Sequence, residues 1–533
     1  MLTAERHPIT AIPGLHRLFL DYQSGSAAVR AFYPSLPQET QPAPSAHRHE
    51  LVRLLTEQNA DSSPAAVAAL DALGGGAGVV VTGQQVGVLG GPLFTPFKAA
   101  TALARAQQAT AGGRPHAALF WLASEDHDFA EISSISVPAG KELAALTYGP
   151  APPAALPVGR IELNDSILHL VDRVRELFPP SEAVEALAVA YRPGRTFAQA
   201  FAEFYSRAFG AKGLLILDAS SREFHRLGAP VLCAALERAD ELHAALVDRS
   251  RALEAAGYHA QVALPPQSSL LFLIDGQTGA RQALRRMVPT PDEPQGLWRI
   301  GNQRFSTADL AGILESEPER ISPSALLRPV FQDFLLGTSL VVGGPAEIAY
   351  FAQSDVLYER ILGRRTPSAP RLFATLIEAA TAELLRRHLL TPEGVMAETA
   401  ETLATRLAER SMPPETKARL DAASGAFEAE LDALLAWMHS QDRGLGQSAE
   451  TAAGKMRYQM GRLRALAANF QLQRENTLAR QAQSICQAIA PGGVPQERVH
   501  AAVYYFARYG LELARVFSEQ AASCNPGHAL LWL

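Results

Sequence analysis

Four ionisable side chains stand in a row at the end of one apolar segment. Glu125, Asp126, His127 and Asp128 follow the run ALFWL at 118–122 almost directly. Carboxylates beside an imidazole can supply a general acid or base, bind a cation or orient an amine. A zinc site is not predicted, because contiguous residues rarely surround one metal ion tetrahedrally. A solvated acidic loop is the alternative, and we favour a catalytic cluster because such a histidine tends to have a perturbed pKa.

A glycine-rich segment, TGQQVGVLGGP at 82–92, follows a second apolar run. Its glycines allow a ligand to approach the backbone, and the N-terminus of the helix that follows offers free N–H groups to a phosphate or carboxylate. The spacing is neither a Walker motif nor a clean G-x-G-x-x-G, so a turn that needs glycine only for packing is the alternative. The predicted substrate- and nucleotide-binding residues of this segment are Thr82, Gly83, Gln84, Gln85, Gly87, Gly91 and Lys98.

A third loop repeats the order of apolar run, glycines and helix. Gly343, Gly344 and Glu347 lie in it, and they are predicted to form a second half of the binding site. Upstream, Arg328 is a candidate fork for a carboxylate, although an ion pair with a nearby aspartate would explain it equally well. His259, in the segment GYHAQV, is a weaker candidate that a purely structural role would also explain.

A parallel sheet would position these three loops at one edge. Short apolar runs alternate with helical patterns, which predicts an α/β protein with a Rossmann-like parallel-sheet core. Ligands of such sheets bind where the carboxyl ends of the strands meet. The predicted strands are 79–81, 117–122, 213–218 and 339–342, and the predicted helices are 47–73, 96–109, 197–209 and one that starts at 346.

The remaining segments differ in character from this core. Residues up to about 44 are rich in Pro, Ser and Ala and are predicted to be irregular, and everything after about 370 is predicted to be helical. Heptad spacing on both sides of QDRGLGQS, taken as a flexible linker, predicts short antiparallel helices of a coiled coil. The predicted organisation is a core of 1–139, 196–235 and 321–375, insertions of 140–195 and 236–320, and a C-terminal helical coiled-coil domain of 376–533.

Composition limits the class of protein and its partners. The 533 residues are 47% hydrophobic and carry a formal net charge of −6, which predicts no nucleic acid and no anionic membrane as a partner. No apolar run reaches the roughly 18 residues that a membrane span needs. The cysteines are few and form no CxxC pair, and the first residues lack the apolar core of a signal peptide, so we expect a cytoplasmic protein.

Six segments, in this order, resemble one known family. The chain is similar to the bacillithiol biosynthesis cysteine-adding enzymes, a family of cysteine ligases, and the likeness covers nearly its whole length. Where members commonly have TGQQAGLFTGPL, this chain has TGQQVGVLGGPL, so the middle of the first loop differs while Gly87 and Gly91 are kept. The segments are TGQQVGVLGGPLFTPFKA, ALFWLASEDHDFAEI, GYHAQV, LLRPVFQDFLLGTSLVVGGPAEIAYFAQ, GGVPQERV and YYFARYG.

The resemblance implies both an architecture and a reaction. It implies a Rossmann-like core akin to class I aminoacyl-tRNA synthetases, two connecting-peptide insertions, and a C-terminal coiled coil that supports a homodimer. It also implies that L-cysteine is added to the amine of glucosaminyl-malate to form bacillithiol, with an adenine nucleotide as ligand. Because amide formation from a free carboxylate is uphill in water, we expect ATP as a co-substrate that activates the cysteine carboxylate.

Roles within the site are hypotheses built on that reaction. The first loop would bind phosphate or a substrate carboxylate, His127 or Asp128 would take the amine proton, and Arg328 would face the malate end. Glu125 and Asp126 would hold Mg²⁺ or the cysteine ammonium. Two other functions stay open, namely a nucleotidyltransferase-like enzyme and a nucleotide-binding dimeric scaffold without ligase activity.

Overall fold

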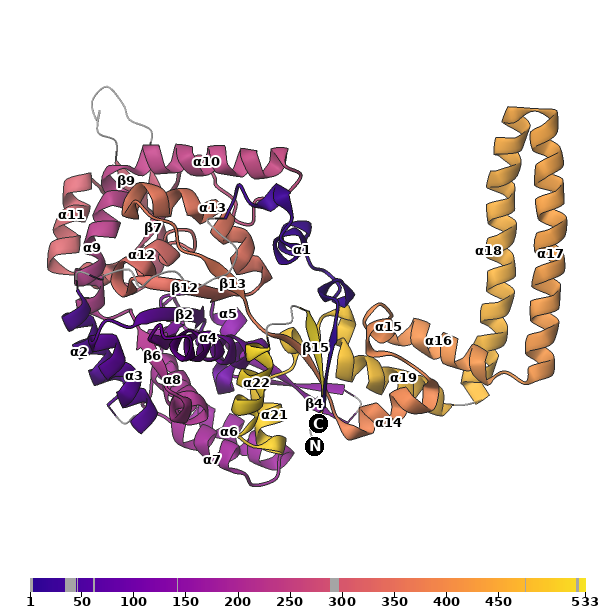
Figure 1. Cartoon of the computed structure of the whole chain (residues 1–533), viewed down its shortest axis with the longest axis horizontal. Coiled ribbons are helices and arrows are strands. Elements are labelled where there is room, and N and C mark those ends of the chain that lie inside the picture. Colours follow the sequence, from indigo (N-terminus) through magenta and orange to yellow (C-terminus); the bar gives the residue numbers. More distant parts are fainter. Residues whose placement is uncertain are drawn as a thin grey trace.

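The structure, a computed structural model, describes residues 3–33, 45, 47–60, 63–140, 142–287, 297–474, 476–523 and 527–533. Figure 1 shows a large α/β body, a smaller body beside it that contains the end of the chain, and a long helical hairpin that projects from the smaller body. Residues 34–44 of the predicted irregular lead-in lie outside the described residues. No helix of the described segments is both long and apolar enough to cross a membrane.

A five-stranded sheet forms the centre of the large body. Its order is β13-β12-β2-β3-β6 and every neighbouring pair is parallel, which confirms the predicted Rossmann-like core. The chain adds strands on one side of β2 first and then on the other, so the winding reverses between β2 and β12. Such a switch point is where open parallel sheets bind ligands. The strands are β2 (Gly78–Gln84), β3 (His116–Leu122), β6 (Leu214–Asp218), β12 (Thr338–Gly343) and β13 (Ser368–Pro370).

The two faces of this sheet contribute to two separate hydrophobic cores. Val80 belongs to one core, whereas Val79 and Val81 belong to the other, as expected for a strand that is buried on both faces. The first core includes residues of α4 (Phe94–Ala111), α8 (Phe197–Phe209), α21 (Ala502–Tyr509) and α22 (Leu513–Ala522). The second includes residues of α2 (Arg48–Gln58), α3 (Pro64–Gly74), α9 (Arg222–Glu237), α12 (Arg328–Leu336) and α13 (Pro345–Leu362).

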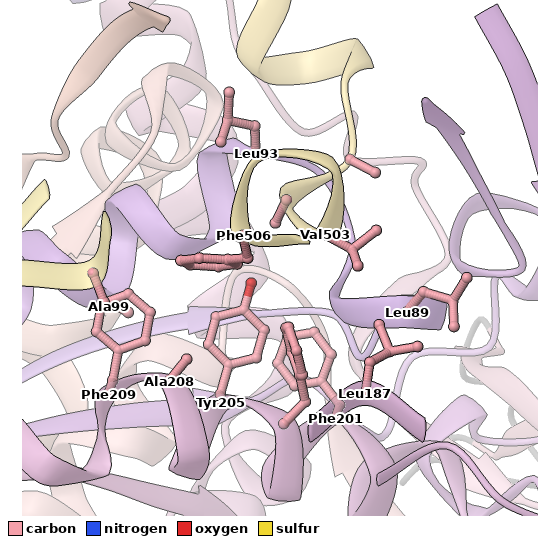
Figure 2. Close-up of a cluster of buried hydrophobic side chains, with 14 of the residues drawn as sticks. Leu89, Leu93, Ala99, Leu187, Phe201, Tyr205, Ala208, Phe209, Val503 and Phe506 are labelled. Carbon is pink, nitrogen blue, oxygen red and sulfur yellow. The ribbon is translucent and has the colours of Figure 1, made fainter. Parts of the chain in front are cut away.

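Part of the first core lies directly against the glycine-rich loop. Figure 2 shows Tyr205 and Phe209 of α8 facing Phe506 of α21, with Leu89 of the loop in the same cluster, next to Leu187. The hydroxyl of Tyr205 donates to the carbonyl of Gly90 at 2.8 Å. The loop is therefore fixed from the core side by buried side chains of two distant helices.

Two insertions interrupt the core. The first contains the antiparallel hairpin β4–β5, and the second begins with a long helix and continues as an antiparallel sheet of order β10-β9-β8-β7-β11. The hairpin β4–β5 extends across the predicted boundary at 139/140, and the second sheet, which includes β11, extends across the predicted boundary at 320/321. The first insertion has α5 (Phe129–Ile132), β4 (Ser134–Ala139), β5 (Glu142–Thr147), α6 (Ser166–Leu177) and α7 (Glu182–Ala190). The second has α10 (Ala239–Ala255), β7 (Ser268–Ile274), β8 (Arg281–Arg286), β9 (Trp298–Ile300), β10 (Gln303–Phe305), α11 (Thr307–Ser316) and β11 (Ile321–Pro323).

The smaller body corrects the prediction that the chain is helical throughout after 370. β14 (Phe373–Ile377) pairs in parallel with β15 (His528–Trp532), and β1 (Thr3–His7) pairs antiparallel with β15. Strands this short give no periodic signal, and their partners lie far away in sequence. The helices here are α14 (Ala379–His388), α15 (Pro392–Met396), α16 (Ala400–Ser411), α17 (Pro414–Gln441), α18 (Arg443–Arg474), α19 (Asn476–Ile489) and α20 (Gln496–Val499).

The predicted antiparallel arrangement of the C-terminal helices is confirmed, whereas the predicted short helices and flexible linker are wrong. Figure 1 shows α17 and α18 as an antiparallel hairpin, and Arg457 of α18 pairs with Glu428 and Asp432 of α17. The helices are long, however, with 28 and 32 residues. The segment predicted to be a flexible linker is largely helical, because α17 ends at Gln441 and α18 begins at Arg443. Asp442, between the two helices, caps α18 by accepting the N–H of Leu445 at 2.9 Å.

Two predictions for the N-terminal region are also wrong. The single helix predicted over 47–73 is split into α2 and α3, because Ser63 caps a new helix that has Pro64 in its first turn. The lead-in is not irregular throughout, since it contains β1 and α1 (Arg17–Ser24).

Candidate active site

A cavity of about 310 Å³ lies at the switch point of the central sheet. It is formed by the carboxyl end of β2, the loop after β3, the start of α13 and residues near the C-terminus. The structure therefore brings residues of all three predicted loops to one place. The lining residues are Gly83, Gln84, Gln85, Phe94, Lys98, Ala123, Asp126, Glu131, Arg328, Gly344, Pro345, Ala346, Glu347, Tyr350, Arg371 and Arg498.

Lys98 ties the first loop to the third. Its side chain is 5% exposed, and its ammonium lies 2.5 Å from Glu347, 2.9 Å from the carbonyl of Gly83 and 2.8 Å from Oε1 of Gln84. Burial lowers the pKa of Lys98 although Glu347 opposes that effect. Because three acceptors already occupy its three N–H bonds, Lys98 holds the two loops together and does not present a free cation to a ligand.

Arg328, at the start of α12, is a cation that lacks a carboxylate partner among the described residues. Its guanidinium donates to the hydroxyl of Tyr350 at 2.6 Å and to Oε1 of Gln332 at 3.3 Å, and both groups are neutral. Burial works against its charge, yet Tyr350 and Glu347 raise the pKa of Arg328. A half-buried guanidinium with only neutral hydrogen-bond partners favours an anionic ligand.

Asp126 and Glu131 form an acidic pair around one amide. Nε2 of Gln85 donates to Oδ2 of Asp126 at 2.5 Å and to Oε2 of Glu131 at 2.8 Å. The second oxygen of Asp126 accepts the backbone N–H of His127 at 2.7 Å. Asp126 is the one member of the predicted catalytic cluster that lines the cavity. Its carboxylate is a candidate for taking a proton or holding an ammonium group.

The other three residues of that cluster point elsewhere. Oε1 of Glu125 lies 2.7 Å from Nε2 of His225, and although burial opposes ionisation, His225 and Arg281 hold the pKa of Glu125 low. Asp128 caps α5 by accepting the N–H of Glu131 at 3.1 Å. Neither Glu125 nor Asp128 lines the cavity.

His127 turns toward the second insertion. Its Nδ1 lies 3.2 Å from the guanidinium of Arg281, which can only donate, so Nδ1 is the acceptor and Nε2 carries the proton. Burial and the charge of Arg281 lower the pKa of His127. A neutral ring in this tautomer has no free lone pair for an amine proton unless Arg281 moves away.

The glycines of the first and third loops have packing roles that can be separated from ligand binding. A Cβ on Gly83 would lie 2.9 Å from the carbonyl oxygen of Trp121, and a Cβ on Gly343 would lie 2.9 Å from Cβ of Glu347. A Cβ on Gly87 would lie 3.0 Å from Cα of Gly91. Each of these close approaches explains why the sequence needs glycine there without invoking a ligand.

The remaining predicted residues divide between the cavity and the core. Thr82 is buried and donates to the carbonyl of Val342 at 3.0 Å, which joins β2 to β12. Gly91 lines a neighbouring cavity, described below. The ring of His259 contacts that of His16 at a tilt of 47°, with ring centroids 4.3 Å apart, and His259 lines neither cavity.

A second cavity, of about 350 Å³, adjoins the first. Its walls come from the glycine-rich loop, β4 and the residues around α20. Gln84, Gln85, Phe94, Glu131 and Arg498 line both cavities and so form their common border. The other lining residues are Gly87, Gly91, Pro92, Ile132, Ser134, Ile135, Ser136, Val499 and Ala501.

Sequence reasoning missed several residues that the structure places at the cavities. Arg371 and Glu497 form a buried bidentate ion pair, with bonds of 2.6 and 3.0 Å, which seats the C-terminal segment beside the sheet. Nε of Arg371 is buried and has no hydrogen-bond partner among the described residues. These contacts span more than 100 residues, so no local pattern signals them. The missed residues are Phe94, Glu131, Tyr350, Arg371 and Arg498, of which all but Arg371 lie in segments that carry the family resemblance.

Known protein families match nearly the whole length of the chain. Residues 6–372 match the family described as bacillithiol biosynthesis BshC, N-terminal Rossmann-like domain, and residues 374–533 match its C-terminal coiled-coil domain. The chain is 38% identical to "Putative cysteine ligase BshC" of Koribacter versatilis, over 98% of each chain. It is 34% identical to the protein of that name from Solibacter usitatus, over 96% of this chain and 97% of the relative. Two domain matches in the order that the fold requires, with relatives matched from end to end, show that the chain belongs to the BshC family of bacillithiol biosynthesis.

Proposed function

We propose that this protein is a ligase that joins the carboxyl group of L-cysteine to the amine of glucosaminyl-malate, with ATP as the co-substrate that activates the carboxyl group. The product is bacillithiol and the new bond is an amide. The names of the relatives support the reaction class. The observation that carries the proposal is the cavity at the switch point, which is lined both by Arg328, a cation with no carboxylate partner among the described residues, and by the acidic pair Asp126 and Glu131.

The first cavity is suited to bind a phosphate or a carboxylate group. Arg328 has only neutral hydrogen-bond partners, and the buried Nε–H of Arg371 has none among the described residues. A phosphate or carboxylate oxygen would satisfy the guanidinium of Arg328, and the contact would gain strength from the low exposure of the site. Arg328 is therefore the group that we expect to hold the phosphate chain or the reacting carboxylate, while Arg371, paired with Glu497, lines the cavity beside it.

The proposed reaction has two steps. A carboxylate oxygen of cysteine attacks the α-phosphorus of ATP, so that an O–P bond forms and pyrophosphate leaves. The amine of glucosaminyl-malate then attacks the carbonyl carbon of the mixed anhydride, the C–N bond forms, AMP leaves, and the amine proton passes to a carboxylate. Asp126 and Glu131 border the cavity and are the candidate acceptors.

The first cavity offers a magnesium ion few carboxylate ligands among the described residues. Mg²⁺ in nucleotide sites is usually held by one or two carboxylates together with phosphate oxygens and water. Glu125, expected from the sequence as one such ligand, is engaged with His225 outside the cavity. Asp126 or Glu131 would hold the ion, whose charge would offset that of the phosphates, and the other carboxylate would remain to take the amine proton.

Reconstitution tests the proposal. Purified protein is incubated with cysteine, glucosaminyl-malate and ATP, with and without Mg²⁺, and the products are identified by mass spectrometry. With cysteine labelled by ¹⁸O in its carboxyl group, we expect bacillithiol together with AMP that carries one ¹⁸O. Bacillithiol with label in inorganic phosphate would replace the adenylate by an acyl phosphate, and no bacillithiol under any of these conditions would contradict the ligase.

The same experiment separates the two alternatives. A nucleotidyltransferase would release an AMP-labelled acceptor in place of an amide. A nucleotide-binding scaffold would bind ATP and form neither product. The projecting α17–α18 hairpin is the feature that keeps the scaffold in consideration.

A further inference from the structure

We propose that the second cavity is the subsite for the amine-bearing acceptor, and that Arg498 is the residue that pairs with the carboxylate of that acceptor. This inference rests on the proposed function and assigns the two halves of the reaction to two adjoining cavities. The acceptor belongs to a definite chemical class: an amino sugar that carries at least one free carboxylate.

The position of Arg498 is the first argument. It lies on α20, a short helix of the C-terminal region, and it lines both cavities. The preceding residue, Glu497, is locked to Arg371 by the buried ion pair, so the backbone of α20 is fixed against the central sheet. The backbone N–H of Ala501 also bonds to the carbonyl of Ser136 on β4 at 2.8 Å. Arg498 is therefore carried by a well-anchored segment although its own side chain is exposed.

The lack of a partner is the second argument. The arginines nearby have hydrogen bonds through their guanidinium groups, to Glu497 for Arg371 and to Tyr350 for Arg328. Within the part of the chain that the structure describes, the guanidinium of Arg498 has no hydrogen bond or ion pair. An arginine that is held at the border of two cavities and keeps all its donors free is suited to bind a carboxylate through two parallel hydrogen bonds.

The lining of the second cavity is the third argument. Arg498 and Glu131 are its only charged residues among those described, and they carry opposite signs. Gln84, Gln85, Ser134 and Ser136 supply neutral hydrogen-bonding groups, as the hydroxyls of a sugar need. An acceptor with an ammonium group, hydroxyls and a carboxylate matches this set. A triphosphate does not, because Arg498 is the only cation there.

The residues that line both cavities indicate how the acceptor is oriented, with its amine toward the first cavity. Glu131 lines both cavities and shares the amide of Gln85 with Asp126. An acceptor amine at Glu131 would therefore face the first cavity, where the cysteine carbonyl is activated. Its carboxylate would extend toward Arg498. The amine proton then has Glu131 or Asp126 as its nearest acceptor.

Kinetics with two acceptors test the subsite. Arg498→Gln is compared with wild type on glucosaminyl-malate and on methyl glucosaminide, which has the same amine and no carboxylate. Because a charged pair to the carboxylate is lost, we expect KM for glucosaminyl-malate to rise roughly 10- to 100-fold. KM for cysteine and for ATP, and kcat/KM for methyl glucosaminide, should change by less than about twofold. Arg498→Lys should recover part of the loss.

Two further comparisons make the result decisive. Arg173→Gln removes an exposed arginine of α6 that pairs with Glu176, and it should leave all these constants unchanged. An unchanged KM for glucosaminyl-malate in Arg498→Gln, or an equal loss on both acceptors, would overturn the inference. If the wild type forms no product at all, the proposed function fails, and calorimetric titration with glucosaminyl-malate then reads the subsite alone. Binding to the wild type that weakens at least tenfold in Arg498→Gln supports it, whereas no binding or equal binding refutes it.

Discussion

At the scale of single residues, the structure separates the side chains that face a ligand from those that hold the loops in place. The sequence predicts contacts with substrate both for Lys98, near the start of a helix, and for Asp126, which follows a strand of the sheet. The ammonium of Lys98 contacts only protein acceptors, whereas the carboxylate of Asp126 lines the cavity. His127 and Glu125 stand next to Asp126 in sequence and yet contact Arg281 and His225.

Lys98→Met tests the role of the buried ion pair. The change leaves Glu347 largely buried without its cation, so we expect the free energy of unfolding to fall by about 3 kcal/mol. Urea denaturation measures it. The double variant Lys98→Met/Glu347→Gln removes the uncompensated charge and should recover part of the loss. A loss below about 1 kcal/mol in the single variant would show that the pair does not hold the loops together.

His127→Gln tests whether the imidazole takes part in the chemistry. Removal of a general base usually lowers kcat by about 10²- to 10⁴-fold. Because Nδ1 of His127 accepts from Arg281 and the ring lies outside both cavities, we expect a loss of less than about tenfold. A larger loss in a variant with unchanged Tm would return His127 to the mechanism.

At the scale of elements, local sequence predicts what local interactions determine. The helix 197–209 was predicted with both ends correct, because Thr196 and Gln199 form a capping box at its start. The apolar run 79–81 likewise lies within β2, in its first half. β14 and β15 were missed, since their ladder joins segments about 150 residues apart. For the same reason Arg371 and Arg498, which contacts between distant segments bring to the cavity, could not be predicted from the residues around them.

His500 follows α20 and connects it to α19 and α21, so the packing of these three helices depends on pH. Its Nε2 donates to the carbonyl of Gln487 at 2.9 Å, and its Nδ1 lies 2.9 Å from the hydroxyl of Tyr505. Burial lowers the pKa of His500 to about 4. In the unfolded chain the imidazole takes up a proton near pH 6.5, so the unfolded state binds more protons than the folded state between pH 6.5 and pH 4.

Stability should therefore fall as the pH drops through that window. We expect His500 alone to account for about 3 kcal/mol of the loss by pH 4. Urea unfolding at pH 7 and at pH 4.5 measures the difference for the wild type and for His500→Gln. The variant should lose less stability than the wild type on acidification, and an identical loss in both proteins would contradict a buried neutral His500.

At the scale of the whole molecule, the α17–α18 hairpin is the part with the least protein around it. Figure 1 shows it projecting away from both bodies. Large apolar side chains are exposed on it, and a cluster of them marks a surface that another chain covers. A second copy of the chain is the partner that the family resemblance implies. These residues are Leu434, Trp437, Leu445, Met456, Tyr458, Leu463, Leu466 and Phe470.

A double substitution on this hairpin tests the expected homodimer. Trp437→Glu/Leu466→Glu places two charges on the exposed apolar surface, so the mass measured by sedimentation equilibrium should change from that of two chains to that of one. Leu168→Glu, at an exposed leucine of α6, is the matched control and should leave the mass unchanged. A wild type that sediments as a single chain would refute the dimer.

The measurement that tests the central claim most directly is the rate of bacillithiol formation in Asp126→Asn. This substitution keeps the size of the side chain and removes the charge that Asp126 places at the first cavity. With cysteine, glucosaminyl-malate and ATP, we expect the rate to fall at least about 10²-fold in a folded variant. Asp172→Asn, at an exposed aspartate of α6, should remain within about twofold of the wild type. An Asp126→Asn enzyme as fast as the wild type would contradict the assignment of the switch-point cavity as the active site.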